Sequence, residues 1–163
     1  MSWTHLHLMI NHLPVLGAPA LLLVLAWALL RRSPGVARAA LWGTVLLAPA
    51  AQLVSLTGEQ TEERLEQVVV LDEALVERHE ELGEIATRVL ILTAVIAAIT
   101  LWRSRRVPGT RLLPATVFAG LLATSGLMAY SAWTGGVIRH TEIRADGAAA
   151  SLTRGAPEGA ERD

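Results

Sequence analysis

Four apolar stretches, each long enough to cross a lipid bilayer, constrain the fold of this chain more than any other feature. A membrane-spanning helix needs about 20 predominantly apolar residues, and we expect four of them, at about residues 8–30, 36–56, 85–102 and 112–133. The composition agrees, because 52% of the 163 residues are hydrophobic and only 18% are charged. We therefore predict an all-α fold, an integral membrane four-helix bundle formed by residues 1–143.

The links between these runs differ in charge. The links "RRSPGVAR" and "RSRRVPGTR" together carry seven Arg and no acid, whereas residues 58–84, between the second and third runs, carry ten acids and two Arg. Because cytoplasmic loops are enriched in basic residues, we expect the two Arg-rich loops inside and both termini and the acidic link outside. No basic residue precedes the first run, and Arg31-Arg32 follow it, so we expect this run to remain as a span rather than act as a cleavable signal peptide.

The acidic link predicts an additional outer amphipathic helix. Its apolar residues recur at roughly helical spacing; they include Leu65, Val68, Val69, Leu75 and Val76. We expect the second run to end near Gly58, which fits a helix C-cap. One helix would follow at the membrane surface, then a turn, then a helix that carries His79 into the third run. Residues 144–163, rich in Ala, Gly and charge, are expected to form a flexible tail.

The residue types that are missing exclude several functions. With no cysteine, the chain cannot form disulfides, thiolate metal sites, iron–sulfur clusters or a covalent C-x-x-C-H haem. The net charge of −1 argues against a nucleic-acid partner. We find no nucleophile–base pair that would make this chain catalytic alone. A metal or haem iron would be held by His, Met or carboxylate.

The five histidines are the candidate ligands, and the predicted topology puts all of them near the outer face: His5, His7, His12, His79 and His140. His12 is the strongest single candidate, because it lies inside the first run, where an imidazole needs a partner. The alternative for His12 is a structural hydrogen bond between helices. For the other four, the alternative is an ordinary surface or interfacial histidine.

Glycines lie near several of these histidines. Gly17 follows His12 by just over one turn, Gly83 follows His79 by one turn, and Gly135-Gly136 precede His140. Glycine within a helix costs about 1 kcal/mol and often marks a close approach. The approach could be that of a flat macrocycle or that of a neighbouring helix, since membrane helices pack through small residues.

Haem b is the first candidate ligand. Two histidines from different helices can hold its iron without leaving an open site, as suits an electron carrier. We expect His12 to pair with His79 on one haem and His7 with His140 on a second, and the exchanged pairing stays open. Zinc or copper is a second candidate, although no short H-x-x-x-H pair is present. A quinone that exchanges protons with His79 and its neighbouring glutamates is a third.

Three separated motifs resemble a bacterial four-span membrane family described only as a domain of unknown function. The stretch "HLMINHLPV" keeps the spacing of that family's H-P-x-x-V-H-F-P opening, with Leu in place of the first Pro and the Phe. The segments "LTGEQTEE" with "ALVERHEELGEIA", and "GGVIRHTEI", resemble its middle and last motifs. The match covers about residues 5–143 and implies a haem b protein encoded beside c-type cytochromes and redox enzymes. His7, His12, His79 and His140 match the family's histidines and would be haem-binding axial ligands; His5 has no counterpart.

These observations predict a cytochrome b-type electron-transfer subunit in the lipid of a bacterial inner (cytoplasmic) membrane. It would hold one or two b haems near the outer face. Electrons would pass between a membrane donor or quinone and a periplasmic partner, such as a c-type cytochrome or a redox-enzyme subunit. The acidic link could attract a basic partner. The alternative is a non-redox membrane anchor or assembly subunit whose histidines are structural.

Overall fold

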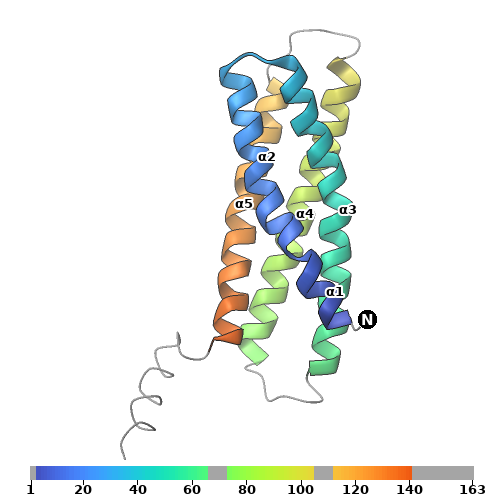
Figure 1. Ribbon diagram of the computed structural model, residues 1–163, viewed down its shortest axis with the longest axis vertical. Coiled ribbons are helices and arrows are strands. Elements are labelled where there is room, and N and C mark those ends of the chain that lie inside the picture. Colours follow the sequence, from blue (N-terminus) through green and yellow to red (C-terminus); the bar gives the residue numbers. More distant parts are fainter. Residues whose placement is uncertain (1–2, 66–72, 105–111, 141–163) are drawn as a thin grey trace, which may run out of the picture.

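The computed structural model describes residues 3–65, 73–104 and 112–140, and these ranges contain helices and no strand. The helices are α1 (Trp3–Ile10), α2 (His12–Leu30), α3 (Pro34–Leu65), α4 (Glu73–Ser104) and α5 (Leu112–Arg139) (Figure 1). The predicted all-α four-helix bundle is confirmed. The expected tail, residues 144–163, lies outside the described residues.

Four helical segments are long and apolar enough to cross a membrane. They are Trp3–Leu30, Pro34–Thr61, Glu73–Ser104 and Leu113–Ile138, where the first combines α1 and α2. Each contains one of the four runs expected from the sequence, apart from one residue at the start of the last. The chain is therefore a membrane protein built from four antiparallel spans.

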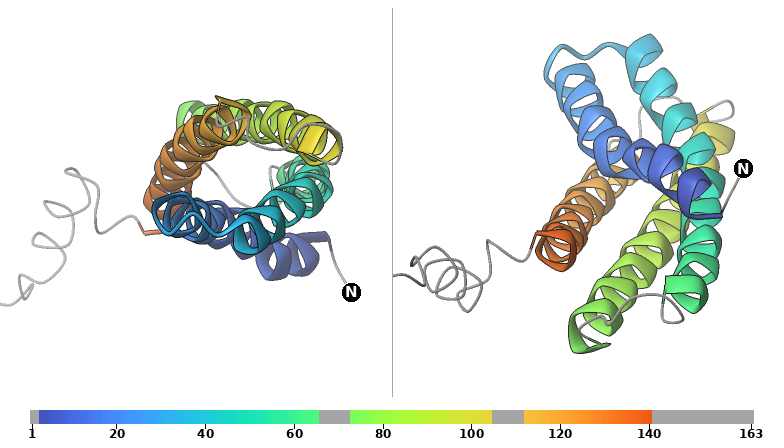
Figure 2. Two further views of the ribbon diagram at one scale, coloured as in Figure 1. Left: turned by 90° about the horizontal axis from the view of Figure 1, so that it is seen from above. Right: turned by 60° about the horizontal axis from the view of Figure 1, so that its bottom comes forward.

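The long helices follow one another around a central axis. Helix α2 packs against α3 and α5, and α4 packs against the same two helices, so that the four enclose a common interior (Figure 2). Helix α1 packs on α3. Helix α1 lies toward the end of the bundle where α3 and α5 finish and α4 begins (Figure 1). We refer to this end as the α1 end.

The acidic link differs from its prediction. Helix α3 continues to Leu65 without a break at Gly58, and α4 begins at Glu73, so the described parts of the link lengthen two spans instead of forming a separate surface helix. Glu, Gln, Arg and Leu all favour helix, and extending an existing helix costs no new nucleation. The turn predicted in this link falls within residues 66–72, which are outside the described ranges. The helix predicted to carry His79 into the third span is confirmed.

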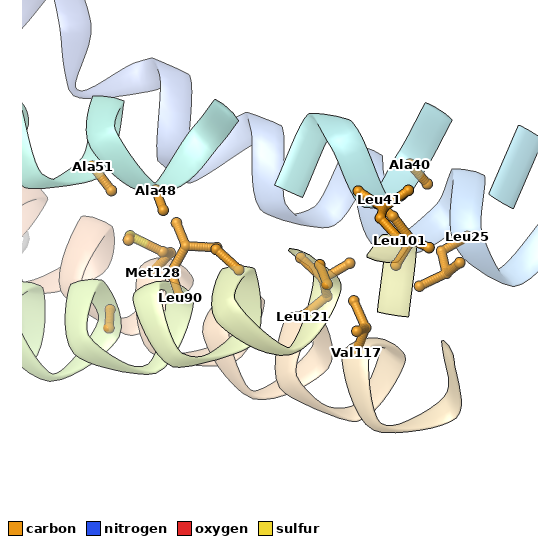
Figure 3. Packing of buried hydrophobic residues seen from close by; sticks show 13 residues of the cluster. Leu25, Ala40, Leu41, Ala48, Ala51, Leu90, Leu101, Val117, Leu121 and Met128 are labelled. Atoms are coloured by element: carbon orange, nitrogen blue, oxygen red, sulfur yellow. The ribbon is translucent and has the colours of Figure 1, made fainter. Parts of the chain in front are cut away.

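Small residues bring the helices close together. The buried core combines alanines with a few larger side chains, among them Leu90, Leu121 and Met128 (Figure 3). Between α2 and α3 the fit is reciprocal: a Cβ at Gly17 would lie 2.8 Å from Leu47 Cδ1, and a Cβ at Gly43 would lie 2.5 Å from Leu21 Cδ2. Gly17 therefore serves helix packing, the second of the two roles considered for it.

Helix α4 approaches α5 in the same way, which gives a test of the packing. The buried side chain of Thr93 lies where a Cβ at Gly120 would be, whereas a Cβ at Gly126 would meet nothing within 4 Å. We expect Gly120→Ala to destabilise the bundle by about 1–3 kcal/mol through overpacking. The control Gly126→Ala should be neutral, or stabilising by up to about 1 kcal/mol, because alanine favours helix. Thermal unfolding in detergent, followed by circular dichroism, measures both, and equal midpoints for the two variants would contradict this packing.

Candidate functional site

His7, on α1, is held against the backbone of α3. Its Nδ1 atom lies 3.1 Å from the carbonyl oxygen of Val54 and 3.3 Å from Thr57 Oγ1. The edge of the ring faces Gly58, where a Cβ would lie only 3.3 Å from His7 Cε1. The ring can therefore reach the carbonyl because the neighbouring helix carries no side chain at this position.

His79, on α4, makes the corresponding contacts with α5, and Ser131 Oγ also lies 3.4 Å from its Nδ1. Its Nδ1 atom lies 2.9 Å from the carbonyl oxygen of Ser131 and 3.3 Å from Thr134 Oγ1. A Cβ at Gly135 would lie 3.0 Å from His79 Cε1. Gly135 therefore makes room for the ring of His79, whereas from the sequence it was noted only because it precedes His140.

A threonine and a glycine thus form each histidine's support. Thr57 donates its hydroxyl hydrogen to the carbonyl of Val54 at 2.9 Å, and Thr134 donates to that of Ser131 at 2.7 Å. Each carbonyl is the one that the histidine also contacts. Both threonine side chains are buried, so each hydroxyl is fixed in place beside an imidazole. We call each carbonyl, threonine and glycine together a histidine cradle.

The likeness between the two histidine sites extends along two helical hairpins. The first hairpin consists of α1, α2 and α3, and the second consists of α4 and α5. In the first, Leu21 lies against Gly43; in the second, Thr93 lies against Gly120. Each pair is the same number of residues from its hairpin's histidine and from its cradle. With the two histidines aligned, buried residues of α2 coincide with buried residues of α4: Pro14 with Ala86, Ala18 with Leu90, Leu25 with Ala97 and Ala28 with Thr100. The two halves therefore share one structural plan.

The cradles determine which nitrogen of each ring carries hydrogen. A carbonyl oxygen can only accept a hydrogen bond, so Nδ1 of His7 and of His79 must be the donor. In the neutral ring, Nε2 then has the free lone pair. Histidines that bind metals commonly have this arrangement, with the second nitrogen donating to a backbone carbonyl. Both rings belong to the α1 end of the bundle, because α1 and the first turns of α4 lie there (Figure 1).

The other three histidines are placed differently. His5 on α1, His12 at the start of α2 and His140 just after α5 are all exposed. The backbone N–H of His140 donates to the carbonyl of Gly136 at 2.9 Å, which continues the helical pattern of α5. Of the four histidines expected as ligands, the structure gives matching cradles to His7 and His79 only.

A metal site made entirely of side chains is not formed in the part of the chain that the structure describes. No three His, Asp or Glu residues there come together in a way that could hold a metal ion. Zinc sites use three or four protein ligands, so these residues do not provide one. Two imidazoles are sufficient for the iron of a haem, because the porphyrin supplies the other four ligands.

Sequence reasoning found the histidines but missed the threonines of the cradles. A signal was present, because the second and fourth apolar runs both end in Thr-Gly, in "LTG" and "WTG". A search for internal repeats would have aligned these two pairs.

Comparison of the chain with protein-family models, with curated proteins and with solved structures gives no match in any of the three. The resemblance carried by the sequence motifs therefore stays a prediction.

The cradle of His79 can be tested without any ligand. In Gly135→Ala the new methyl group should push the ring away by a few tenths of an ångström, since it would lie 3.0 Å from Cε1. We expect the His79 Cε1–H signal to shift in NMR spectra of histidine-labelled protein, with His79→Ala used to assign it. Gly136→Ala is the matched control, because a Cβ at Gly136 would meet nothing within 4 Å. An unchanged signal in Gly135→Ala would rule out the cradle.

Proposed function

We propose that this protein is a membrane cytochrome b-type electron-transfer subunit, and that His7 and His79 are the two axial ligands of one b haem. The observation that carries the proposal is the matched pair of cradles. In each of them Nδ1–H donates to a helix carbonyl, at 3.1 Å for His7 and 2.9 Å for His79. That bond leaves Nε2 as the nitrogen available to iron.

The placement of the two rings supports a flat ligand held between the halves of the bundle. Each half of the bundle supplies one imidazole, so a ligand between them would be bound from two different helices, as axial ligation requires. Bare glycine backbone at Gly58 and Gly135 allows both rings to sit deep against their helices. A haem bound here would supply one-electron redox chemistry. The protein's own residues would bind it, fix the tautomer of each ligand and exclude water.

The proposed pairing is the exchanged one of the two considered from the sequence. It uses His7 with His79, which leaves His12 and His140 for a second haem if the protein binds two. Both of these rings are exposed. The number of haems bound per chain must therefore be measured to decide whether His12 and His140 hold a second haem.

We also propose that the α1 end faces the periplasm of a bacterial inner membrane. Exposed carboxylates at this end include Glu59, Glu73 and Glu77, and a surface of this charge favours encounter with a basic redox partner. Arg31 and Arg32 lie at the opposite end, in agreement with a cytoplasmic position for basic loops. A membrane donor or quinone would exchange electrons with the haem from within the bilayer.

Removing either proposed ligand tests the haem. We expect the purified protein, loaded with haem, to show a low-spin spectrum with two nitrogen ligands, and its pigment to be extracted by acidified acetone, because no cysteine is available to bond it. His7→Ala and His79→Ala should each lose the low-spin signal, since one axial bond is missing. His5→Ala is the control on the same helix as His7 and should leave the spectrum unchanged.

If His7→Ala and His79→Ala both keep full haem content and an unchanged low-spin spectrum, neither residue is a ligand. If the unaltered protein binds no haem, the membrane-anchor alternative becomes the better account, and the cradles are then structural hydrogen bonds between helices.

Reporter fusions test the orientation. A reporter that is active only in the periplasm should be inactive when fused at Gly35 or at Gly109, because both positions lie in the Arg-rich links expected in the cytoplasm. The same reporter fused at the N-terminus should be active. Periplasmic activity at Gly35 or Gly109 would reverse the proposed orientation.

A further inference from the structure

Asn11, which joins α1 to α2, has a buried polar atom without a partner. Its Oδ1 atom is buried and makes no hydrogen bond, and it is the only such side-chain atom in the part of the chain that the structure describes. Leaving a buried acceptor unpaired is costly, and more so in a protein surrounded by lipid. Asn11 therefore calls for an explanation that its neighbours in the chain do not supply.

The usual role of asparagine at a helix start does not apply. An N-cap residue has non-helical backbone angles and bonds a backbone N–H with its side chain. Asn11 instead has φ −60° and ψ −27°, which are helical values, and its side chain makes no capping bond. Its own N–H donates to the carbonyl of His7 at 2.9 Å, so the helical pattern runs through it. The amide is consequently not needed to begin α2.

The position of Asn11 relates it to the proposed haem ligands. It lies four residues after His7, and residues four apart share one face of a helix. The residue four positions after His79 is Gly83, which lies close to α5, since a Cβ there would be 3.7 Å from Ser131 Oγ. The two halves of the site thus differ at this point, because the first offers an amide and the second offers only backbone.

We infer that the side-chain amide of Asn11 is a third binding group of this site and donates a hydrogen bond to a carboxylate of the haem; the inference rests on the proposed function. The oxygen and nitrogen of an amide occupy equivalent positions and are assigned from their partners, so a turned amide presents N–H to the site. Carboxylates are the polar groups of haem b. On α4, Arg78 donates to Tyr130 and Arg88 donates to Glu84. Because these two cations already have partners, a neutral amide can serve as the donor to the haem carboxylate.

The test compares haem b with its dimethyl ester, in which both carboxylates are methylated. Full-length protein in detergent is titrated with each, and binding is followed by the low-spin absorption band. We expect Asn11→Leu to bind haem about tenfold more weakly, as for one hydrogen bond to a charged group, and to bind the dimethyl ester with unchanged affinity. Asn11→Asp should weaken haem binding further, because it sets like charges together, and the ester should relieve this loss.

Two controls separate this role from a structural one. Gln52→Leu removes an exposed amide from α3 and should change neither affinity. Without haem, Asn11→Leu should unfold at a higher temperature than the unaltered protein, because the unpaired amide is gone. A lower unfolding temperature would show that the amide supports the fold and would overturn the inference.

The remaining outcomes distinguish the two proposals. If the unaltered protein binds haem through His7 and His79 but Asn11→Leu loses affinity equally for haem and ester, or for neither, the role of Asn11 is wrong and the haem site stands. If the unaltered protein binds neither porphyrin with a low-spin spectrum, the proposed function fails and the inference fails with it.

Discussion

One interaction, made twice, fixes how the helices of this protein meet: a histidine Nδ1–H donates to a backbone carbonyl of the neighbouring antiparallel helix. A threonine of the same helix already donates to each carbonyl, and the histidine can reach it only if the two helices lie very close. Gly58 and Gly135 allow that approach. In an apolar surrounding an unpaired imidazole N–H would be costly, so the bond specifies the register of α1 on α3 and of α4 on α5. The glycines farther along the same hairpins keep that register through the membrane.

The repetition of this bond in two hairpins explains why the proposed site would lie between the halves of the chain. Each hairpin has a small-residue face that it cannot bury alone, and the two faces together form the core (Figure 3). Each hairpin also brings one imidazole to the α1 end. A ligand that needs two opposed nitrogens is therefore served by the assembled bundle and by neither half separately. Asn11 in the first half and Gly83 in the second break this likeness, so a bound ligand would have a preferred orientation.

The sequence was sufficient to predict the four spans, their order and the helix that carries His79, because each apolar run is long and each link is distinct in charge. It could not predict which histidines pack against a neighbouring helix. Helix α2 is apolar on all of its faces, so its sequence pattern does not identify the face that points into the bundle. The prediction favoured His12 only because it lies inside the first apolar run. It lies exposed, whereas His7 packs on α3. Gly58 resembled a helix end for a related reason, since glycine marks both helix ends and close approaches, and only the neighbouring helix distinguishes them.

The surroundings of the two imidazoles also bear on the direction of electron flow in the proposed site. An imidazole that donates Nδ1–H to a carbonyl is a more basic ligand, and a more basic ligand stabilises oxidised iron more than reduced iron. The exposed carboxylates of Glu59, Glu73 and Glu77 at the same end of the bundle add negative charge, which acts in the same sense. Hydrogen bonding and charge are two means by which a protein sets a haem potential, and in the proposed site both would lower it. A haem of low potential gives up its electron readily, so the site suits a donor to a partner of higher potential. The carboxylates that lower the potential would also attract a basic partner, so the same charges favour both its docking and the transfer of the electron to it.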